Sequence, residues 1–310
     1  MPAGAASPRA DDALVAALAA HVTDRDRAIC EALYEHRVLT ATQLAQLHFN
    51  SLERGRKRLT LLHQLGVLDR FRPHRAQGSH PYHYLLDRLG AQLVAAERGL
   101  DLADLDWTRA KTLRLAGSAQ LQHLVEASGF FTRFAHALRR APDGALLSWS
   151  GQRRCAQRWG DLVRPDGHAR LALPAGRLDV WLEWDRATEP HARLRDKLDR
   201  YDELALALDQ PLTLLFVAPG ERRERHILHG LQPADDVRVL TTTAERHHAD
   251  PLARNWLAAG AERRVALAEL ATTSAAPGLR PGRERPPLSG SSAGPQRPEL
   301  TITDRDEPPT

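Results

Sequence analysis

The apolar run Leu-Thr-Leu-Leu-Phe-Val-Ala at residues 212–218 restricts the fold of this chain more than any other stretch. Side chains on a strand point alternately to the two faces of a sheet, so a strand that is apolar on both faces must be covered on both. Before it, residues 189–209 carry apolar residues at helical spacing, from Leu194 to Leu208. These patterns predict an amphipathic helix next to a buried central strand.

The same alternation of patterns extends over residues 118–270. It predicts the order helix, three strands, helix, strand, helix, strand, built around a central mixed sheet. The expected helices are 118–140, 189–209 and 221–231. The expected strands are 145–150, a segment around 161–167, 177–185, 212–218 and 237–243.

Residues 23–98 carry a different, mainly helical pattern. Thr23 or Asp24 suits a helix N-cap, and Gly66 suits a helix stop. The predicted order is three helices, a hairpin and a fourth helix, which is the order of a winged helix-turn-helix. In such a domain the third helix enters the major groove of DNA and the hairpin contacts the backbone beside it. The whole chain is therefore predicted to be α+β, with the winged helix first.

Basic residues gather on the third helix and the hairpin of this domain. Between residues 51 and 75 there are seven basic side chains and only two acidic ones, Glu53 and Asp69. Such clustering is the electrostatic footprint of phosphate contacts, so we predict double-stranded DNA as a partner. The predicted DNA contacts are Arg54, Arg56, Lys57, Arg58, Arg70, Arg72 and Arg75. The other interpretation is a solvated basic face on a domain that makes protein contacts, for example in a homodimer.

The composition sets limits on class and compartment. A chain of 310 residues with a formal net charge of +4 allows two domains and permits nucleic acid as a partner. Cys30 and Cys155 are far apart and have no metal-ligand spacing, which fits a reducing, cytoplasmic location. No apolar run approaches the length needed to span a bilayer, so we expect no membrane partner.

The remaining segments are predicted to lie outside the two domains. Residues 1–22 are expected to be a weakly ordered leader, and residues 99–117 a linker. Residues 271–310 are rich in Pro, Gly, Ser, Arg and acids. Such a segment buries too little apolar surface to offset the entropy of ordering, so we expect a disordered tail.

Acidic residues gather on two neighbouring predicted strands. Asp166 lies at the end of the second strand, and Glu183 and Asp185 share one face of the third. The other face of the third strand is apolar and fits a helix: Leu178, Val180, Leu182 and Trp184. Two adjacent carboxylates repel each other unless a cation lies between them, and oxygen ligands suit Mg²⁺ or Mn²⁺. Such a metal would activate water and neutralise charge on a phosphodiester.

Each of these residues also has a structural interpretation. Pro-Asp-Gly at residues 165–167 is a common turn sequence, so Asp166 could merely shape a turn. Glu183 and Asp185 could cap the next helix or pair with Arg193. Lys197 could be a solvated residue on the flank of its helix.

The element order, with acids on the second and third strands, resembles the restriction-endonuclease-like fold of the PD-(D/E)XK superfamily. This resemblance implies that Asp166 and Glu183 are catalytic. It also implies a lysine two residues after the Glu, where this chain has Asp185. Some members of the superfamily carry that lysine on the following helix, which implies Lys197 as the catalytic lysine here. Asp185 and Glu126 would then add metal ligands beside Asp166 and Glu183.

Several segments in combination resemble the replication-relaxation family of actinobacterial plasmids and integrative elements. They are RDRAICEALYEHRVLTATQLAQLHF, LLHQLGVLDRFRP, PYHYLL, RPDG, LEWDRATEP, KLDRY and LLFVAP, spread from about Asp24 to Pro219. Ala187 stands where family members usually have Gly. The resemblance implies a role in plasmid replication or its relaxation, with plasmid replication or transfer proteins as partners. Two functions follow: metal-dependent DNA nicking or processing, and non-catalytic DNA-binding regulation in which the nuclease-like domain serves dimerisation or partner contacts.

Overall fold

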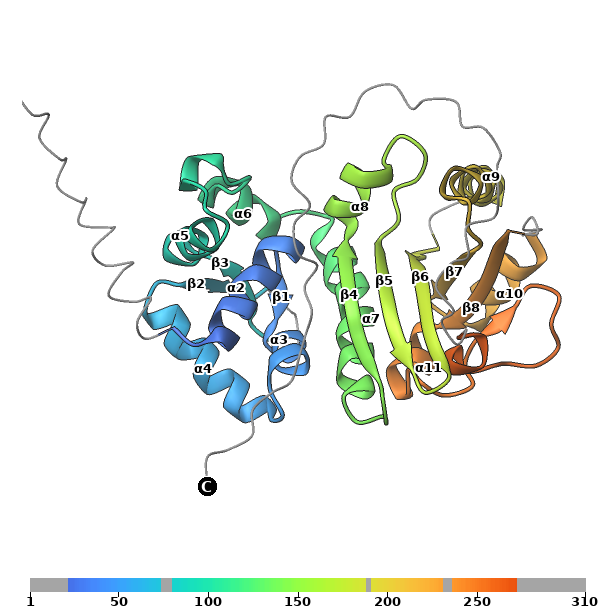
Figure 1. Ribbon diagram of the computed structural model, residues 1–310, viewed down its shortest axis with the longest axis horizontal. Helices are drawn as coiled ribbons and strands as arrows, with labels where there is room; N and C mark the ends of the chain where they lie inside the picture. The colour runs from blue at the N-terminus through green and yellow to red at the C-terminus, as the bar shows by residue number, and fades with distance from the viewer. Residues whose placement is uncertain (1–21, 74–79, 188–190, 231–235, 272–310) are drawn as a thin grey trace, which may run out of the picture. The chain divides into compact units, whose positions relative to one another are not determined.

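The computed structural model describes residues 22–73, 80–187, 191–230 and 236–271 (Figure 1). The chain divides into two compact units. The first unit contains the chain up to His136 together with residues 151–157, and the second contains residues 137–150 together with the chain from Arg158 onward. Apart from Val22 and Ala271, the predicted leader and the predicted tail lie outside the described residues.

The first unit begins with helices and a small sheet. Its elements are α2 (Asp24–His36), β1 (Leu39–Thr40), α3 (Ala41–His48), α4 (Leu52–Gln64), β2 (Leu68–Phe71), β3 (His83–Leu86) and α5 (Arg88–Glu97). The strands pair antiparallel in the order β1-β3-β2. The predicted order of three helices, hairpin and helix is present, and the two-residue strand β1 adds a third strand to the hairpin.

Local sequence signals set the ends of these helices. Thr23 and Thr40 each form a capping box with the residue three positions later, Asp26 and Gln43. Gly66 has a φ of 72° directly after α4, a left-handed conformation that favours glycine, so the predicted helix stop is confirmed. The chain then enters β2, which packs against α4.

The predicted linker contains two short elements, the 3₁₀ helix η1 (Leu102–Asp104) and α6 (Arg109–Ala116). They lead into the long helix α7 (Leu121–Leu138). Gln43 Nε2 on α3 donates a hydrogen bond of 2.6 Å to the carbonyl oxygen of Val125 on α7. Buried residues that precede β1 or lie in β3, α6 and α7 form one cluster: Val38, Leu85, Leu115 and Leu121. Most of α7, predicted to open the second domain, therefore packs within the first unit.

The second unit is built on a six-stranded sheet with the order β4-β5-β6-β7-β8-β9. Its elements are β4 (Ala145–Gly151), the end of α8 (Gln152–Trp159), β5 (Gly167–Leu173), β6 (Gly176–Trp184), α9 (His191–Leu208), β7 (Leu212–Ala218), α10 (Glu221–Gly230), β8 (Val237–Thr243), α11 (Ala244–Ala249), β9 (Leu257–Ala258) and η2 (Leu267–Leu270).

The sheet is mixed, which confirms the predicted α+β class. β5 and β6 are antiparallel, β6, β7 and β8 are parallel, and β9 is antiparallel to β8. The two parallel connections run in the same direction across the sheet, so right-handed crossovers place α9 and α10 on one face. These two helices contact each other. All seven residues of β7 are buried, as its apolar sequence predicts.

Two details of the second unit differ from the sequence prediction. The strand expected around residues 161–167 begins only at Gly167, and α8 was not predicted. Pro165 has no N–H for a strand ladder, whereas the residues after it alternate in burial as a strand requires. None of the described helices is both long and apolar enough to cross a membrane.

Candidate active site

Asp166 and Glu183 are brought together by the β5–β6 hairpin. In the antiparallel register Gly167 lies opposite Leu182, and one further step places Asp166 opposite Glu183. The Asp166 N–H donates to the carbonyl oxygen of Leu182 at 2.9 Å. Asp166 Oδ2 in turn accepts a hydrogen bond of 2.8 Å from the Trp184 N–H. The acid at the start of β5 is thereby fixed at the end of β6.

Both oxygens of the Glu183 carboxylate are held by α9. Lys197 Nζ donates to Glu183 Oε2 at 2.8 Å, and Tyr201 Oη donates to Glu183 Oε1 at 2.6 Å. Lys197 and Tyr201 are four residues apart and therefore point from the same side of the helix. Tyr201 also contacts the ring of Trp181, which precedes Glu183 by two residues on the same face of β6. The helix expected on the apolar face of this strand thus covers the face that carries Glu183.

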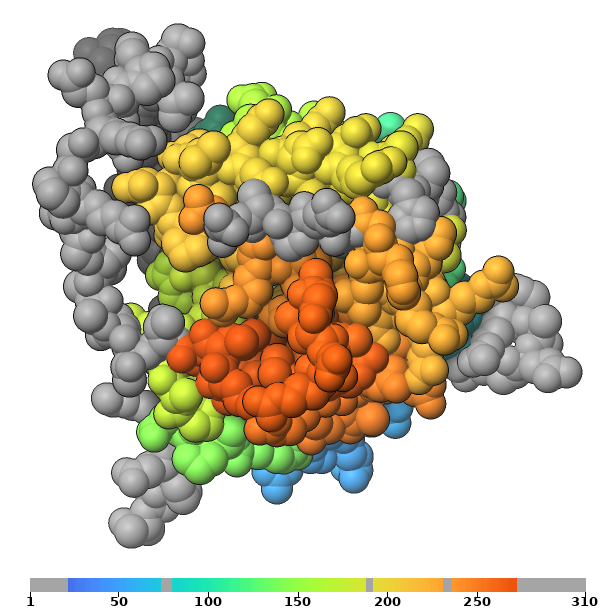
Figure 2. All heavy atoms as spheres, turned by 90° about the vertical axis from the view of Figure 1, so that its right-hand side faces the viewer, coloured from blue at the N-terminus to red at the C-terminus, as the bar shows by residue number. Residues whose placement is uncertain are grey.

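Burial has the largest effect on the pKa of Glu183. The residue is only 5% exposed, whereas the Lys197 side chain is 29% exposed. Loss of water raises the pKa of Glu183, and the nearby Asp166 carboxylate raises it further, whereas the Lys197 ammonium and the Tyr201 hydroxyl oppose the shift. In the space-filling view α9 forms a continuous layer of the second unit (yellow in Figure 2). Asp166 and Lys197 are half-buried, so solvent reaches these two side chains rather than Glu183.

Asp185, at the position where the PD-(D/E)XK resemblance implies a lysine, belongs to a separate ion pair. Arg223 on α10 donates from Nε to Asp185 Oδ2 at 2.6 Å and from its second nitrogen to Oδ1 at 3.1 Å. The side chains of Asp185 and Arg223 are 4% and 13% exposed. The Ala187 N–H adds a hydrogen bond of 3.1 Å to Asp185 Oδ1. The proposed ligand Asp185 is therefore already neutralised by an arginine.

The fourth expected metal ligand, Glu126, lies on α7 in the first unit and accepts a hydrogen bond of 2.8 Å from Gln122. Within the described ranges, no group of three or more His, Cys, Asp or Glu side chains is placed to hold a metal ion. Asp166 and Glu183 remain as a pair. Mg²⁺ often takes only one or two protein carboxylates and keeps several waters, so this pair fits such an ion. Asp185 is held in its ion pair with Arg223 instead.

The basic residues predicted to contact DNA fall into two groups on the first unit. Arg54, Arg56 and Lys57 are exposed on α4, and Lys57 pairs with Glu53 at 2.8 Å. On the hairpin, the guanidinium groups of Arg70 and Arg72 lie 4.2 and 4.0 Å from the ring centre of Tyr82. Arg75 lies outside the described residues.

Arg58 has a different role from its neighbours on α4. Its Nε donates to Asp26 Oδ1 at 2.8 Å, and its second nitrogen bonds the other oxygen of that carboxylate. Asp26 is fully buried, and Thr23 also bonds to it. Burial alone would raise the pKa of Asp26, but the hydrogen bonds from Arg58 and Thr23 lower it. Arg58 thus neutralises a buried carboxylate inside the domain, which the exposed cations of α4 do not.

Sequence reasoning missed Tyr201 and Arg223 as partners of the acids. Tyr201 falls within the apolar pattern of residues 189–209, and its spacing of four from Lys197 is the one sequence signal that links the two residues. No comparable signal marks Arg223, which lies 38 residues after Asp185.

Comparisons with known proteins place the chain in a family. Among solved structures, the restriction endonuclease FokI matches with 13% identity over 76% of this chain and 42% of FokI, at a TM-score of 0.26. The chain thus spans less than half the length of FokI. No curated protein matches the chain. The sequence model of the replication-relaxation family matches residues 31–216, more than half of the chain, and the protein belongs to this family.

Proposed function

We propose that this protein binds the DNA of a plasmid or integrative element in the cytoplasm and nicks or processes it in a metal-dependent reaction. The proposal rests on membership of the replication-relaxation family and on one geometric observation. Two carboxylates and one ammonium group meet on the sheet: Asp166 lies opposite Glu183, and Lys197 donates to Glu183 at 2.8 Å. Two carboxylates can hold a divalent cation that activates water, and an ammonium group can stabilise charge on the attacked phosphate.

In this proposal Asp166 and Glu183 hold Mg²⁺ or Mn²⁺. A bound divalent cation lowers the pKa of a coordinated water and neutralises charge that develops on the phosphodiester. Each carboxylate oxygen has two lone pairs, so Glu183 can keep its bonds to Lys197 and Tyr201 while it binds a cation. The Lys197 ammonium would stabilise negative charge on the attacked phosphate, and Tyr201 would keep the Glu183 carboxylate in one orientation.

The first unit supplies DNA binding in this proposal. Helices and hairpin follow the order expected of a winged helix, and the exposed cations of α4 would contact the backbone or bases of duplex DNA. Arg70 and Arg72 are held on the hairpin by Tyr82, which limits their side-chain freedom before binding. A preorganised pair of arginines suits contacts to two phosphates.

The test is conversion of supercoiled plasmid to the nicked form with Mg²⁺ or Mn²⁺, using DNA of the replicon that encodes the protein. The parent should nick the plasmid, EDTA should stop the reaction, and Asp166→Asn and Glu183→Gln should each lower the rate by at least about a hundredfold. Nicking that persists in both variants would come from a contaminant, and the catalytic proposal would then fail.

A second function, DNA-binding regulation without catalysis, is favoured by one observation. Glu183 is nearly fully buried, and both of its oxygens are already hydrogen bonded by Lys197 and Tyr201. Such a carboxylate can simply anchor α9 to the sheet, leaving the second unit free for dimerisation or partner contacts. Plasmid maintenance in cells distinguishes the two functions. Glu183→Gln should abolish maintenance if catalysis is required and leave it intact if the protein only regulates.

A further inference from the structure

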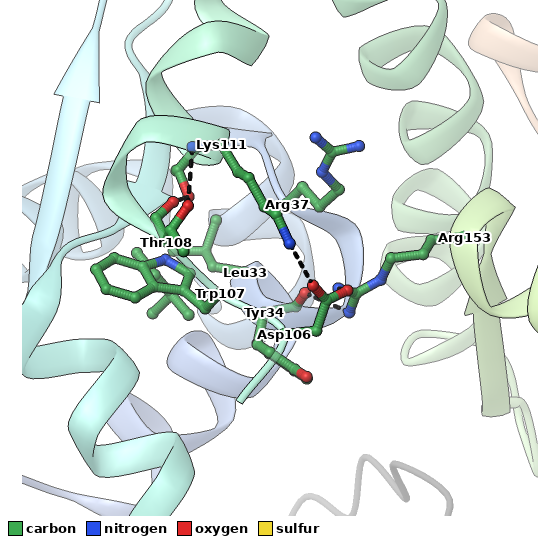
Figure 3. Close-up of a pocket in the computed structure, with 10 residues that line it drawn as sticks. Leu33, Tyr34, Arg37, Asp106, Trp107, Thr108, Lys111 and Arg153 are labelled. Carbon is green, nitrogen blue, oxygen red and sulfur yellow. Dashed lines mark hydrogen bonds and ion pairs between the residues drawn. The ribbon is translucent and has the colours of Figure 1, made fainter. Parts of the chain in front are cut away.

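A cavity of about 190 Å³ lies within the first unit, in the region drawn in Figure 3. Its wall combines the end of α2, the residues before and within α6, and Arg153 from α8. Aliphatic and aromatic side chains form part of the lining, among them Leu33, Tyr34 and Trp107. The residues that line the cavity belong to the first unit, whereas Asp166 and Glu183 belong to the second.

Three cationic side chains line this cavity against a single acid. Lys111 Nζ donates to Asp106 Oδ1 at 2.8 Å, and Arg153 donates to Asp106 Oδ2 at 3.3 Å, as the dashed lines in Figure 3 show. The third cation, Arg37, makes no side-chain hydrogen bond or ion pair to any described residue. Its side chain is partly buried, and loss of water together with the positive charge of Arg153 lowers its pKa. The cavity therefore carries an excess of positive charge.

The buried polar atoms of the lining that lack a hydrogen-bond partner are N–H donors. Trp107 Nε1 and Arg153 Nε are buried and have no hydrogen-bond acceptor among the described residues. The Arg37 guanidinium adds further donors. A ligand that completes this set must bring acceptor oxygens, because the lining already has donors in surplus.

Two features distinguish the arginines of this cavity: the backbone conformation of Arg37 and the contacts of Arg153 with Tyr34. Arg37 adopts a φ of 68° at the end of α2, a left-handed conformation that residues with a side chain rarely adopt. Arg153 donates to the carbonyl oxygen of Tyr34 at 3.1 Å, and its guanidinium lies 4.9 Å from the centre of the Tyr34 ring. Arg98 lies 4.3 Å from the same ring. The Arg153 guanidinium is therefore held in place before any ligand arrives.

We propose that this cavity binds the phosphate group of a phosphate monoester, either a free nucleoside monophosphate or the 5′ end of a DNA strand. The guanidinium and ammonium groups that line the cavity match the oxygens of a terminal phosphate. Tyr34 and Trp107 offer aromatic surface for an attached base. Drug-sized ligand pockets measure roughly 300–1,000 Å³, and the smaller volume here suits one phosphate with a limited organic part.

The test is calorimetric titration of the full chain with dAMP and with a short oligonucleotide, with and without a 5′ phosphate. Two variants probe the site, Arg37→Gln and Lys111→Met, and Arg114→Gln on the exposed side of α6 is the matched control. Binding of dAMP by the parent identifies a free nucleotide as the source. Tighter binding of the phosphorylated than the unphosphorylated oligonucleotide, without dAMP binding, identifies a strand end.

In either case the two site variants should weaken binding at least about tenfold, and the control should leave it within about twofold. Lys111 is exposed, so Lys111→Met remains informative if Arg37→Gln fails to fold. The proposal is overturned if dAMP does not bind and the 5′ phosphate makes no difference to the oligonucleotide. It is equally overturned if Arg114→Gln loses as much affinity as the site variants.

Discussion

Lys197 Nζ lies 2.8 Å from Glu183 Oε2, although the two residues come from different elements, α9 and β6. The position two residues after Glu183 holds Asp185, which is paired with Arg223 on α10. The cation nearest the Glu183 carboxylate therefore comes from the helix that follows the strand. Asp166 lies opposite Glu183 on the neighbouring strand.

Tyr201→Phe should impair the reaction while leaving the fold intact. The change removes only the hydroxyl that donates to Glu183 Oε1 at 2.6 Å, so the carboxylate loses one of its two restraints. We expect about a tenfold slower nicking rate and a requirement for more Mn²⁺, with a loss of unfolding free energy of about 1–2 kcal/mol. Nicking rates over a Mn²⁺ titration and urea unfolding measure both effects. An unchanged metal requirement would show that Tyr201 serves only packing.

Arg223→Met should destabilise the second unit strongly. Asp185 would remain as a buried carboxylate without its bidentate partner, and breaking a buried pair costs about 3–5 kcal/mol. The double variant Asp185→Asn with Arg223→Met should recover much of that loss, because it removes the stranded charge. Chemical denaturation compares the three proteins. A loss below about 1 kcal/mol in the single variant would contradict the buried ion pair.

The basic residues of α4 should separate into two classes. Arg54→Gln with Lys57→Gln should weaken duplex binding and reduce its salt dependence while leaving stability unchanged, because both side chains are exposed. Arg58→Ala should instead lower the unfolding free energy by about 2 kcal/mol or more, because it strands the buried Asp26 carboxylate. Gel shifts at several salt concentrations, paired with unfolding curves, give both quantities. Equal effects of the two changes on stability would refute this division.

His168 should make the second unit sensitive to acid. The ring is packed against Trp159 and Trp181, and burial, aided by the charges of Arg158 and Arg170, lowers its pKa from 6.5 to about 3. Asp179, with an oxygen 3.6 Å from Nε2, does not reverse the shift. Since the folded pKa is depressed, the stabilisation is complete above pH 6.5 and is lost as pH falls towards 3.

The matched variant for this titration is His168→Phe, which keeps an aromatic ring against the two tryptophans but cannot bind a proton. Between pH 6 and pH 4 the parent should lose up to about 1.4 kcal/mol more unfolding free energy per pH unit than the variant. Urea unfolding at pH 7, 5.5 and 4.5 measures the difference. Parallel pH profiles for the two proteins would show that His168 is not held neutral.

Periodicity in the sequence was sufficient to predict the α+β class, the buried strand at residues 212–218 and the helix stop at Gly66. It also put Asp166 and Glu183 on neighbouring strands, although the strand before Glu183 is Gly167–Leu173 rather than a segment around 161–167. Each of these features is determined by residues that lie close together in the sequence.

The partners of the charged side chains could not be predicted in the same way. Arg58 pairs with a carboxylate 32 residues earlier, and Arg223 with one 38 residues earlier. Neither spacing follows from helix or strand periodicity, because each pair forms only when separate elements pack. For the same reason no sequence signal marks the contact of Gln43 with Val125, which joins α7 to the first unit.

The central claim, catalysis by Asp166, Glu183 and Lys197, is tested most directly by comparing two charge-removing changes on α9. Lys197→Met removes the ammonium beside Glu183, whereas Arg195→Met removes an exposed cation two residues earlier on the same helix. In the supercoiled-plasmid assay with Mg²⁺ or Mn²⁺, we predict that Lys197→Met lowers the nicking rate by at least about a hundredfold and that Arg195→Met stays within about twofold of the parent. Equal rates for Lys197→Met and the parent, with both proteins folded, would contradict the account.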